Sequence, residues 1–91
     1  GMNQSIIFTE QLTWDVQLSA IHFTAQQQGM VIDCYIGQKV LEHLAAEKIN
    51  NSEQALSLFE QFRFDIEEQA EKLIEQEAFD VQGHIQVERV D

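Results

Sequence analysis

Arg63 is the residue whose surroundings in the sequence most strongly favour chemistry. A helical pitch of about 100° per residue places Arg63 on the same apolar stripe as Phe59 and Ile66, so its charge faces a predicted core. A charge in that position must be paired, because burying it alone is too costly. Glu60 and Glu67 lie three residues before and four residues after it, on the same side of the helix. The pattern predicts either a structural ion-pair network or a site at which Arg63 holds an anion or a partner.

Three further residues could complete such a site from the sheet side of the molecule. Asp15 and Asp33 belong to the strand-rich N-terminal half and could reach the Arg63 guanidinium. Trp14 lies in a predicted loop, where its ring either packs across the edge of the core or forms an exposed anchor for a partner. The candidate interaction or anion site accordingly comprises Arg63, Trp14, Asp15 and Asp33.

Cys34 and the three histidines do not form a pattern that predicts catalysis or metal binding. Cys34 alternates with Ile32 and Ile36 on one strand face, where a thiol behaves as a small apolar side chain. A nucleophilic cysteine instead needs exposure, a low pKa and a neighbouring base. The three histidines lack the sequence spacing that is typical of metal ligands; they are His22, His43 and His84. We therefore expect no catalytic residue, no metal and no cofactor, and we expect that the chain is not an enzyme.

The chain of 91 residues is strongly acidic, with 16 carboxylates against five Lys and Arg residues and a net charge of -11. That field repels phosphate, so neither nucleic acid nor an anionic membrane is an expected partner. The charge favours solubility, and it permits a basic partner. A single cysteine, with no signal-peptide pattern and no long apolar run, predicts a cytoplasmic protein. The length predicts a single domain over residues 2–91, with Gly1 interpreted as the remnant of a cleaved tag.

The N-terminal half has the residue pattern of a sheet. Residues 6–8 form a short apolar strand pattern, and the more polar residues 9–15 are interpreted as a loop. Residues 16–25 alternate as a strand whose first part has the opposite phase, which predicts a bulge or burial on both faces. Residues 26–29 end in glycine and predict a hairpin into a further strand over residues 30–36.

The C-terminal half has the pattern of two helices and a last strand. Apolar residues at helical spacing predict a helix over residues 38–48, and the Asn-Asn pair after it breaks the pattern. Ser52 is the predicted N-cap of a second helix that spans residues 52–78, and alternation over residues 84–90 predicts a strand. The order β-β-β-α-α-β predicts an α+β fold of two layers, in which two helices cover one face of a mostly antiparallel sheet.

Shared strand and helix faces predict which side chains form the core. The residues that we expect to be buried together are Phe23, Ile32, Cys34, Phe59 and Ile66. Two apolar residues, Leu58 and Phe64, lie off the main stripe of the second helix. They either cover the remaining sheet surface or form a dimer contact.

The order of these landmarks resembles a known bacterial family. The residues that carry the resemblance are Phe8, Trp14-Asp15, Phe23-Thr24-Ala25, Val31-Ile32-Asp33-Cys34-Tyr35-Ile36, Leu41, Phe59, Phe62-Arg63 and Ile66-Glu67-Glu68-Gln69-Ala70. They cover nearly the whole chain and are similar to those of the family called domain of unknown function 1488. That family usually has a serine at the position of Gly37, but glycine also serves as a helix N-cap. The resemblance implies no established activity, and the location of some family members beside shikimate dehydrogenase implies a regulatory or accessory role by association.

Two functions remain open on these observations. The first is a non-enzymatic interaction module that acts through protein contacts, either with another protein or as a homodimer. The second is a small-ligand or regulatory domain, linked to the shikimate pathway by family resemblance alone, that uses Arg63 near an anion site. Whether the Arg63 guanidinium faces an open pocket without a carboxylate partner distinguishes the two.

Overall fold

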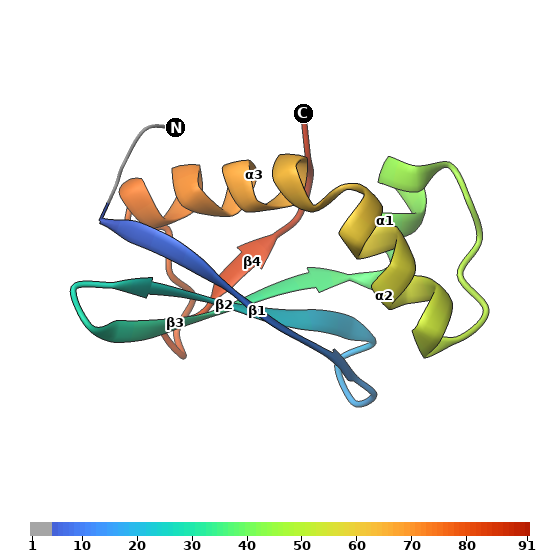
Figure 1. Ribbon diagram of the computed structural model, residues 1–91, viewed down its shortest axis with the longest axis horizontal. Coiled ribbons are helices and arrows are strands. Elements are labelled where there is room, and N and C mark those ends of the chain that lie inside the picture. Colours follow the sequence, from blue (N-terminus) through green and yellow to red (C-terminus); the bar gives the residue numbers. More distant parts are fainter. Residues whose placement is uncertain (1–4) are drawn as a thin grey trace.

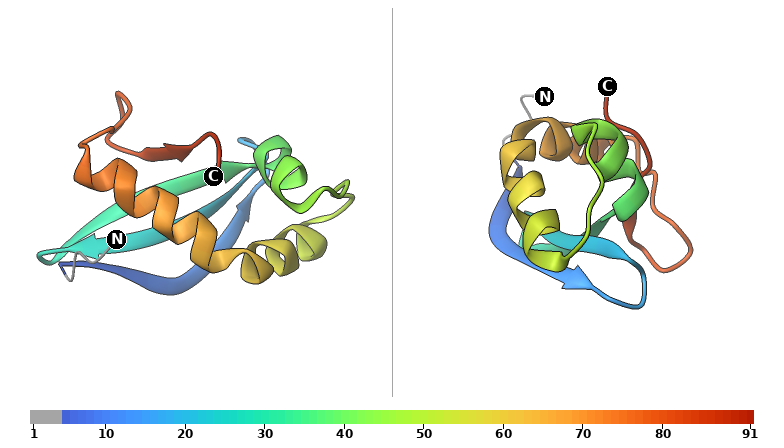
Figure 2. Two further views of the ribbon diagram at one scale, coloured as in Figure 1. Left: turned by 90° about the horizontal axis from the view of Figure 1, so that it is seen from above. Right: turned by 90° about the vertical axis from the view of Figure 1, so that its right-hand side faces the viewer.

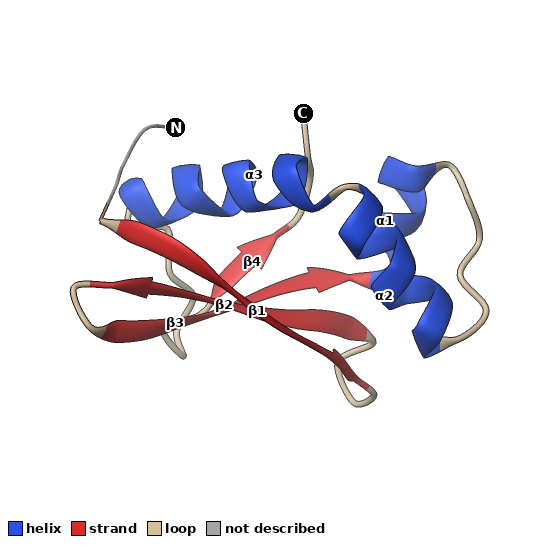
Figure 3. Ribbon diagram, viewed as in Figure 1, coloured by secondary structure: helices blue, strands red, loops and turns tan. Residues whose placement is uncertain are grey.

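The computed structural model describes residues 5–91, so the predicted tag remnant Gly1 and the predicted domain start at residue 2 lie outside the described residues. The described chain forms three strands, three helices and a final strand (Figure 1). Their bounds are β1 Ile6–Asp15, β2 Ala20–Gln27, β3 Met30–Gly37, α1 Gln38–Ala45, α2 Ser52–Gln61, α3 Arg63–Glu75 and β4 Ile85–Val87. In Figure 3, α3 runs along the sheet while α1 and α2 lie at one end of it.

The four strands form one sheet in the order β1-β2-β3-β4. The strands β1, β2 and β3 are antiparallel neighbours, whereas β4 lies parallel to β3. Parallel pairing requires a long crossover, which the three helices between β3 and β4 provide. The predicted α+β class and mostly antiparallel sheet are therefore confirmed, with the correction that three helices rather than two form the second layer (Figure 2).

The predicted long helix over residues 52–78 is two helices, because the chain leaves helical geometry at Phe62. The Phe62 backbone has φ -108° and ψ 18°, although its N–H still donates to the carbonyls of Leu58 and Phe59. The change of direction lets α2 contact β1 and β2 while α3 contacts β4. The apolar stripe does not reveal this break, because both helices turn that stripe toward the sheet.

The ends of the helices also differ from those that the sequence predicts. Ala46 and Glu77 adopt the left-handed conformation, with φ of 54° and 55°, and each closes its helix with backbone hydrogen bonds of the Schellman type. The helices α1 and α3 therefore stop before the predicted ends at residues 48 and 78. The N-cap of α2 is Asn51 rather than Ser52, because Asn51 Oδ1 accepts a hydrogen bond from Gln54 N at 2.8 Å.

The strand β1 includes residues 9–15, which the sequence analysis interpreted as a loop. Phe8 pairs with Ala25 and Leu12 pairs with Phe23, so β1 uses two residues more than β2 between these pairs. The extra residues form a bulge. Because their number is even, Leu12 stays on the same face as Phe8. The polar residues in the bulge interrupt the alternation of apolar and polar side chains, so the sequence pattern does not predict this part of the strand.

The strand β2 begins at Ala20, later than the predicted start at residue 16. Residues 16–19 form the turn between β1 and β2, and Asp15 Oδ1 accepts a hydrogen bond from Leu18 N at 2.9 Å. The side chains of Val16 and Leu18 are 77% and 56% exposed. Val16 and Leu18 are out of phase with the rest of the predicted strand because they lie in a turn. The predicted bulge or two-sided burial at this point is therefore wrong.

The hairpin into β3 is confirmed, and the last strand is shorter than predicted. Gln28 and Gly29 form a two-residue turn with φ of 53° and 82°, which suits the twist of the flanking strands. Of the predicted strand over residues 84–90, only three residues pair with β3. Both apolar residues of this short strand, Ile85 and Val87, are buried on the core face.

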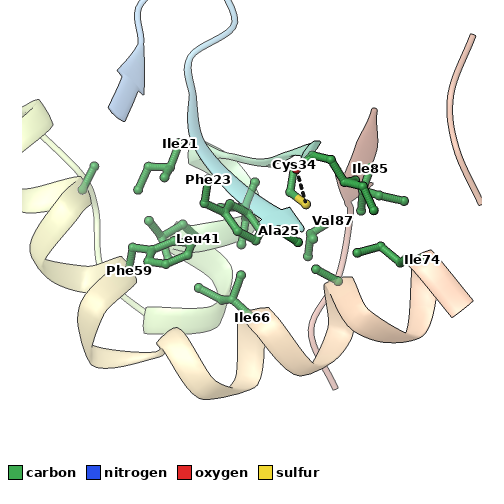
Figure 4. Close-up of a cluster of buried hydrophobic side chains, with 14 of the residues drawn as sticks. Ile21, Phe23, Ala25, Cys34, Leu41, Phe59, Ile66, Ile74, Ile85 and Val87 are labelled. Carbon is green, nitrogen blue, oxygen red and sulfur yellow. Dashed lines mark hydrogen bonds between the residues drawn. The ribbon is translucent and has the colours of Figure 1, made fainter. Parts of the chain in front are cut away.

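The core lies between the sheet and the helices (Figure 4). The five side chains predicted to be buried together are all 8% exposed or less, which confirms the assignment. The rings of Phe23 and Phe59 lie with centroids 5.0 Å apart and join β2 to α2. Leu58 also belongs to this core at 6% exposure, whereas Phe64 is 89% exposed, so the two residues off the predicted stripe have different roles.

Replacing Phe59 by Ala tests the core assignment. The substitution removes a fully buried ring and its contact with Phe23, so we expect the free energy of unfolding to fall by about 3–5 kcal/mol. The matched control is Phe64→Ala, which removes an exposed ring and should change stability by less than about 0.5 kcal/mol. Urea denaturation followed by circular dichroism measures both, and an unchanged midpoint for Phe59→Ala would contradict the assignment.

Candidate functional site

Arg63 lies at the joint between α2 and α3 and is held by a carboxylate from each helix. Its Nε and Nη2 atoms donate to Glu60 Oε1 and Oε2 at 2.7 and 3.0 Å. Its Nη1 atom donates to Glu67 Oε2 at 2.9 Å. The bidentate ion pair with Glu60 combines charge with two directional hydrogen bonds. The ion pairs that the sequence spacing predicts are therefore confirmed.

The Arg63 side chain also packs onto the core. Its guanidinium carbon lies 5.2 Å from the centre of the Phe59 ring, and the side chain is 20% exposed. The hydrogen bonds that Arg63 donates to Glu60, and then the one to Glu67, raise the pKa of Arg63 above its usual range. The hydrogen bonds from Arg63 lower the pKa of Glu60. The charges of this network are therefore stabilised by one another.

Two shallow hollows lie where the helix joint and α3 face β1. One is lined by Phe8, Thr9, Glu10, Glu60, Arg63 and Glu67. The other is lined by Phe8, Phe64, Asp65, Glu67, Glu68 and Glu71. Because Phe8 and Glu67 line both hollows, we treat them as one groove and call it the β1 groove. Among the described residues that line this groove, the carboxylates outnumber the one base, so the groove repels anions and offers no support for an anion site at Arg63.

The structure does not bring the other three predicted site residues into contact with Arg63. Trp14 is half-buried and packs against the core. Of the two roles considered for its ring, the structure therefore shows packing rather than an exposed anchor. Asp15 closes the turn after β1, and Asp33 Oδ1 lies 2.7 Å from His22 Nε2. Across residues 5–91, the ion pairs of Arg63 are those with the two glutamates of the joint. The four predicted residues thus occupy separate environments.

A row of rings on the sheet face away from the core was not predicted from the sequence. Tyr35 lies between His22 and His84, with ring centroids 4.9 and 5.2 Å away. Thr13 Oγ1 lies 3.5 Å from His22 Nδ1, while Asp33 contacts the other ring nitrogen, so the imidazole is held in one orientation. The hairpin register places His22 opposite Tyr35. That pairing is the signal in the sequence from which part of the row could have been found.

Cys34 lacks the properties of a nucleophile. Its side chain is fully buried, and its Sγ atom lies 3.8 Å from the carbonyl oxygen of Ile32. Burial, with smaller contributions from the charges of Asp33 and Glu67, raises the pKa of the Cys34 thiol to about 12. A protonated and shielded thiol is unreactive. Among the residues that the structure describes, no three metal-ligating side chains come together.

Fold and site together define a small α+β domain with its helices on one face of the sheet and an acidic groove beside β1. A family model described as "Protein of unknown function (DUF1488)" matches residues 6–87. The chain belongs to this family, as its landmarks predict. No curated protein matches the chain. None of the described helices has the length and apolar character needed to cross a membrane.

Two substitutions separate the charge of Arg63 from its packing. Arg63→Met keeps an apolar stem over Phe59 but removes both ion pairs, each worth about 0.5–1 kcal/mol at a partly buried position. Arg63→Ala also removes the stem, so its cost in unfolding free energy should exceed that of Arg63→Met by about 1 kcal/mol. Urea denaturation at low and high salt measures both, and salt should reduce the cost of Arg63→Met. If Arg63→Met were the less stable variant, the packing role would be refuted.

Proposed function

We propose that this chain is a non-enzymatic interaction module that acts through protein contacts. The observation that carries the proposal is Phe64, whose ring is 89% exposed in the β1 groove beside Phe8. Burying an aromatic side chain of this size contributes roughly 1.5–3 kcal/mol. Aromatic residues are enriched at protein interfaces, where such burial anchors the partner.

The charge of the chain supports a protein as the partner of this module. A net charge of -11 disfavours nucleic acid and anionic membranes, and it favours association with a basic protein surface. The free and buried Cys34 fits a reducing compartment, where unpaired thiols persist. We therefore place the proposed module in the cytoplasm.

Quantitative affinity capture from a cell lysate tests the proposal with three forms of the chain. They are the unaltered chain, Phe64→Ala and the matched control Phe79→Ala, which changes a ring that is 41% exposed between α3 and β4. We expect the unaltered chain and Phe79→Ala to capture the same protein. Capture by Phe64→Ala should fall about tenfold or more, because anchor residues often contribute about 2 kcal/mol.

Binding of the captured protein, once purified, is then measured by calorimetry with each of the three chains. Light scattering of each chain alone tests the homodimer, and a dimer that Phe64→Ala converts into a monomer would identify a second copy as the partner. Equal capture and equal affinity for all three chains would refute the proposed role of Phe64.

A further inference from the structure

The strand β1 has one unpaired side in the part of the chain that the structure describes. It pairs with β2 alone and forms one edge of the sheet, while the much shorter β4 forms the other. Figure 1 shows β1 at the front of the sheet with α3 above it, and Figure 2 shows it at the margin of the sheet. A free edge presents backbone N–H and C=O groups that can pair with an added strand.

The side chains beside this edge differ between the two faces of the sheet. On the helix face, Phe8 and Phe64 provide the apolar surface of the β1 groove. The carboxylates of the same groove are Glu10, Glu60, Asp65, Glu67, Glu68 and Glu71. Among the described residues that line the groove, Arg63 is the one base, and Glu60 and Glu67 hold it. On the face of the sheet away from the helices, Ile7 presents an apolar side chain that is 63% exposed.

We infer that the free edge of β1 and the β1 groove together bind an extended, cationic segment of a partner protein, which adds to the sheet as a further strand. The inference rests on the proposed function and names the chemistry of the partner. Successive side chains of a strand point to opposite faces. A segment that alternates basic and apolar residues therefore sets its bases against the carboxylates and its apolar residues beside Ile7. An arginine on the groove side also stacks on the exposed Phe64 ring.

A second copy of the chain fits this edge less well than a cationic segment does. Pairing β1 with β1 of another copy across a two-fold axis places one acidic groove beside another, and each chain carries a net charge of -11. Like charges brought together in this way repel, whereas a basic segment gains from the same field. Charge complementarity therefore selects the cationic partner.

The bulge in β1 defines where the added strand pairs. The register shifts between Phe8 and Leu12, and within the bulge the N–H of Gln11 already donates to Thr9 Oγ1 at 3.2 Å. The regular part of the edge before the bulge is residues 6–8. The added strand is therefore expected to pair along residues 6–8.

An NMR titration of the isotope-labelled chain tests the inference with a blocked peptide in which Arg alternates with Val. We expect amide shifts in β1 and the first turn of α3, slower hydrogen exchange in β1, and cross-strand contacts between the peptide and residues 6–8. One control peptide has Glu in place of Arg, and another has N-methyl groups that prevent backbone pairing. Neither control should bind at peptide concentrations up to about 1 mM.

A pair of charge variants locates the binding site. Glu10→Gln removes one exposed charge from the β1 groove and should weaken binding of the Arg-Val peptide about two- to fivefold. Glu88→Gln removes one exposed charge beside β4 and should leave the affinity unchanged. The inference would be overturned if the two variants changed the affinity equally, or if the N-methylated peptide bound as tightly as the Arg-Val peptide. Amide shifts confined to the row of His22, Tyr35 and His84 would also overturn it.

The capture experiment and the peptide titration distinguish failure of this inference from failure of the proposed function. If Phe64-dependent capture of a protein persists while the Arg-Val peptide does not bind, the inference is overturned and the interaction module stands. If capture does not depend on Phe64 and the peptide does not bind, both are overturned.

Discussion

Phe59 makes the contacts on which the rest of the structure depends, because it joins the sheet to the helix joint. Its ring packs against Phe23 with centroids 5.0 Å apart, and the guanidinium carbon of Arg63 lies 5.2 Å from its centre. Arg63 in turn holds Glu60 from α2 and Glu67 from α3. One short series of contacts therefore connects the buried face of the sheet to the acidic wall of the β1 groove.

Much of this fold is predictable from the sequence because each element buries one face. Ile32 and Cys34 lie on one face of β3, and Phe59 and Ile66 recur at helical spacing, so the core follows from simple periodicity. The breaks do not follow, because the apolar stripe continues through the change of direction at Phe62. The bulge in β1 and the left-handed helix ends are equally hidden, since residue type alone does not predict them.

Sequence spacing predicts the ion pairs that Arg63 makes within its own helical turn. It does not predict which other parts of the fold surround Arg63. Its partners lie within one turn, and the backbone at the joint stays close enough to helical geometry to keep both contacts. The groove depends on β1 passing beside α3, which is a tertiary arrangement that spacing does not encode. Asp33, expected near Arg63, instead contacts His22 on the face of the sheet away from the helices.

A double-mutant cycle between Phe59 and Arg63 tests most directly the claim that the core and the groove are joined through this contact. The variants are Phe59→Leu, Arg63→Met and the two together, compared with the unaltered chain by urea denaturation. We predict a coupling free energy of about 0.5–1 kcal/mol, because either single substitution already removes the contact between cation and ring. Effects that add to within about 0.3 kcal/mol would contradict the claim.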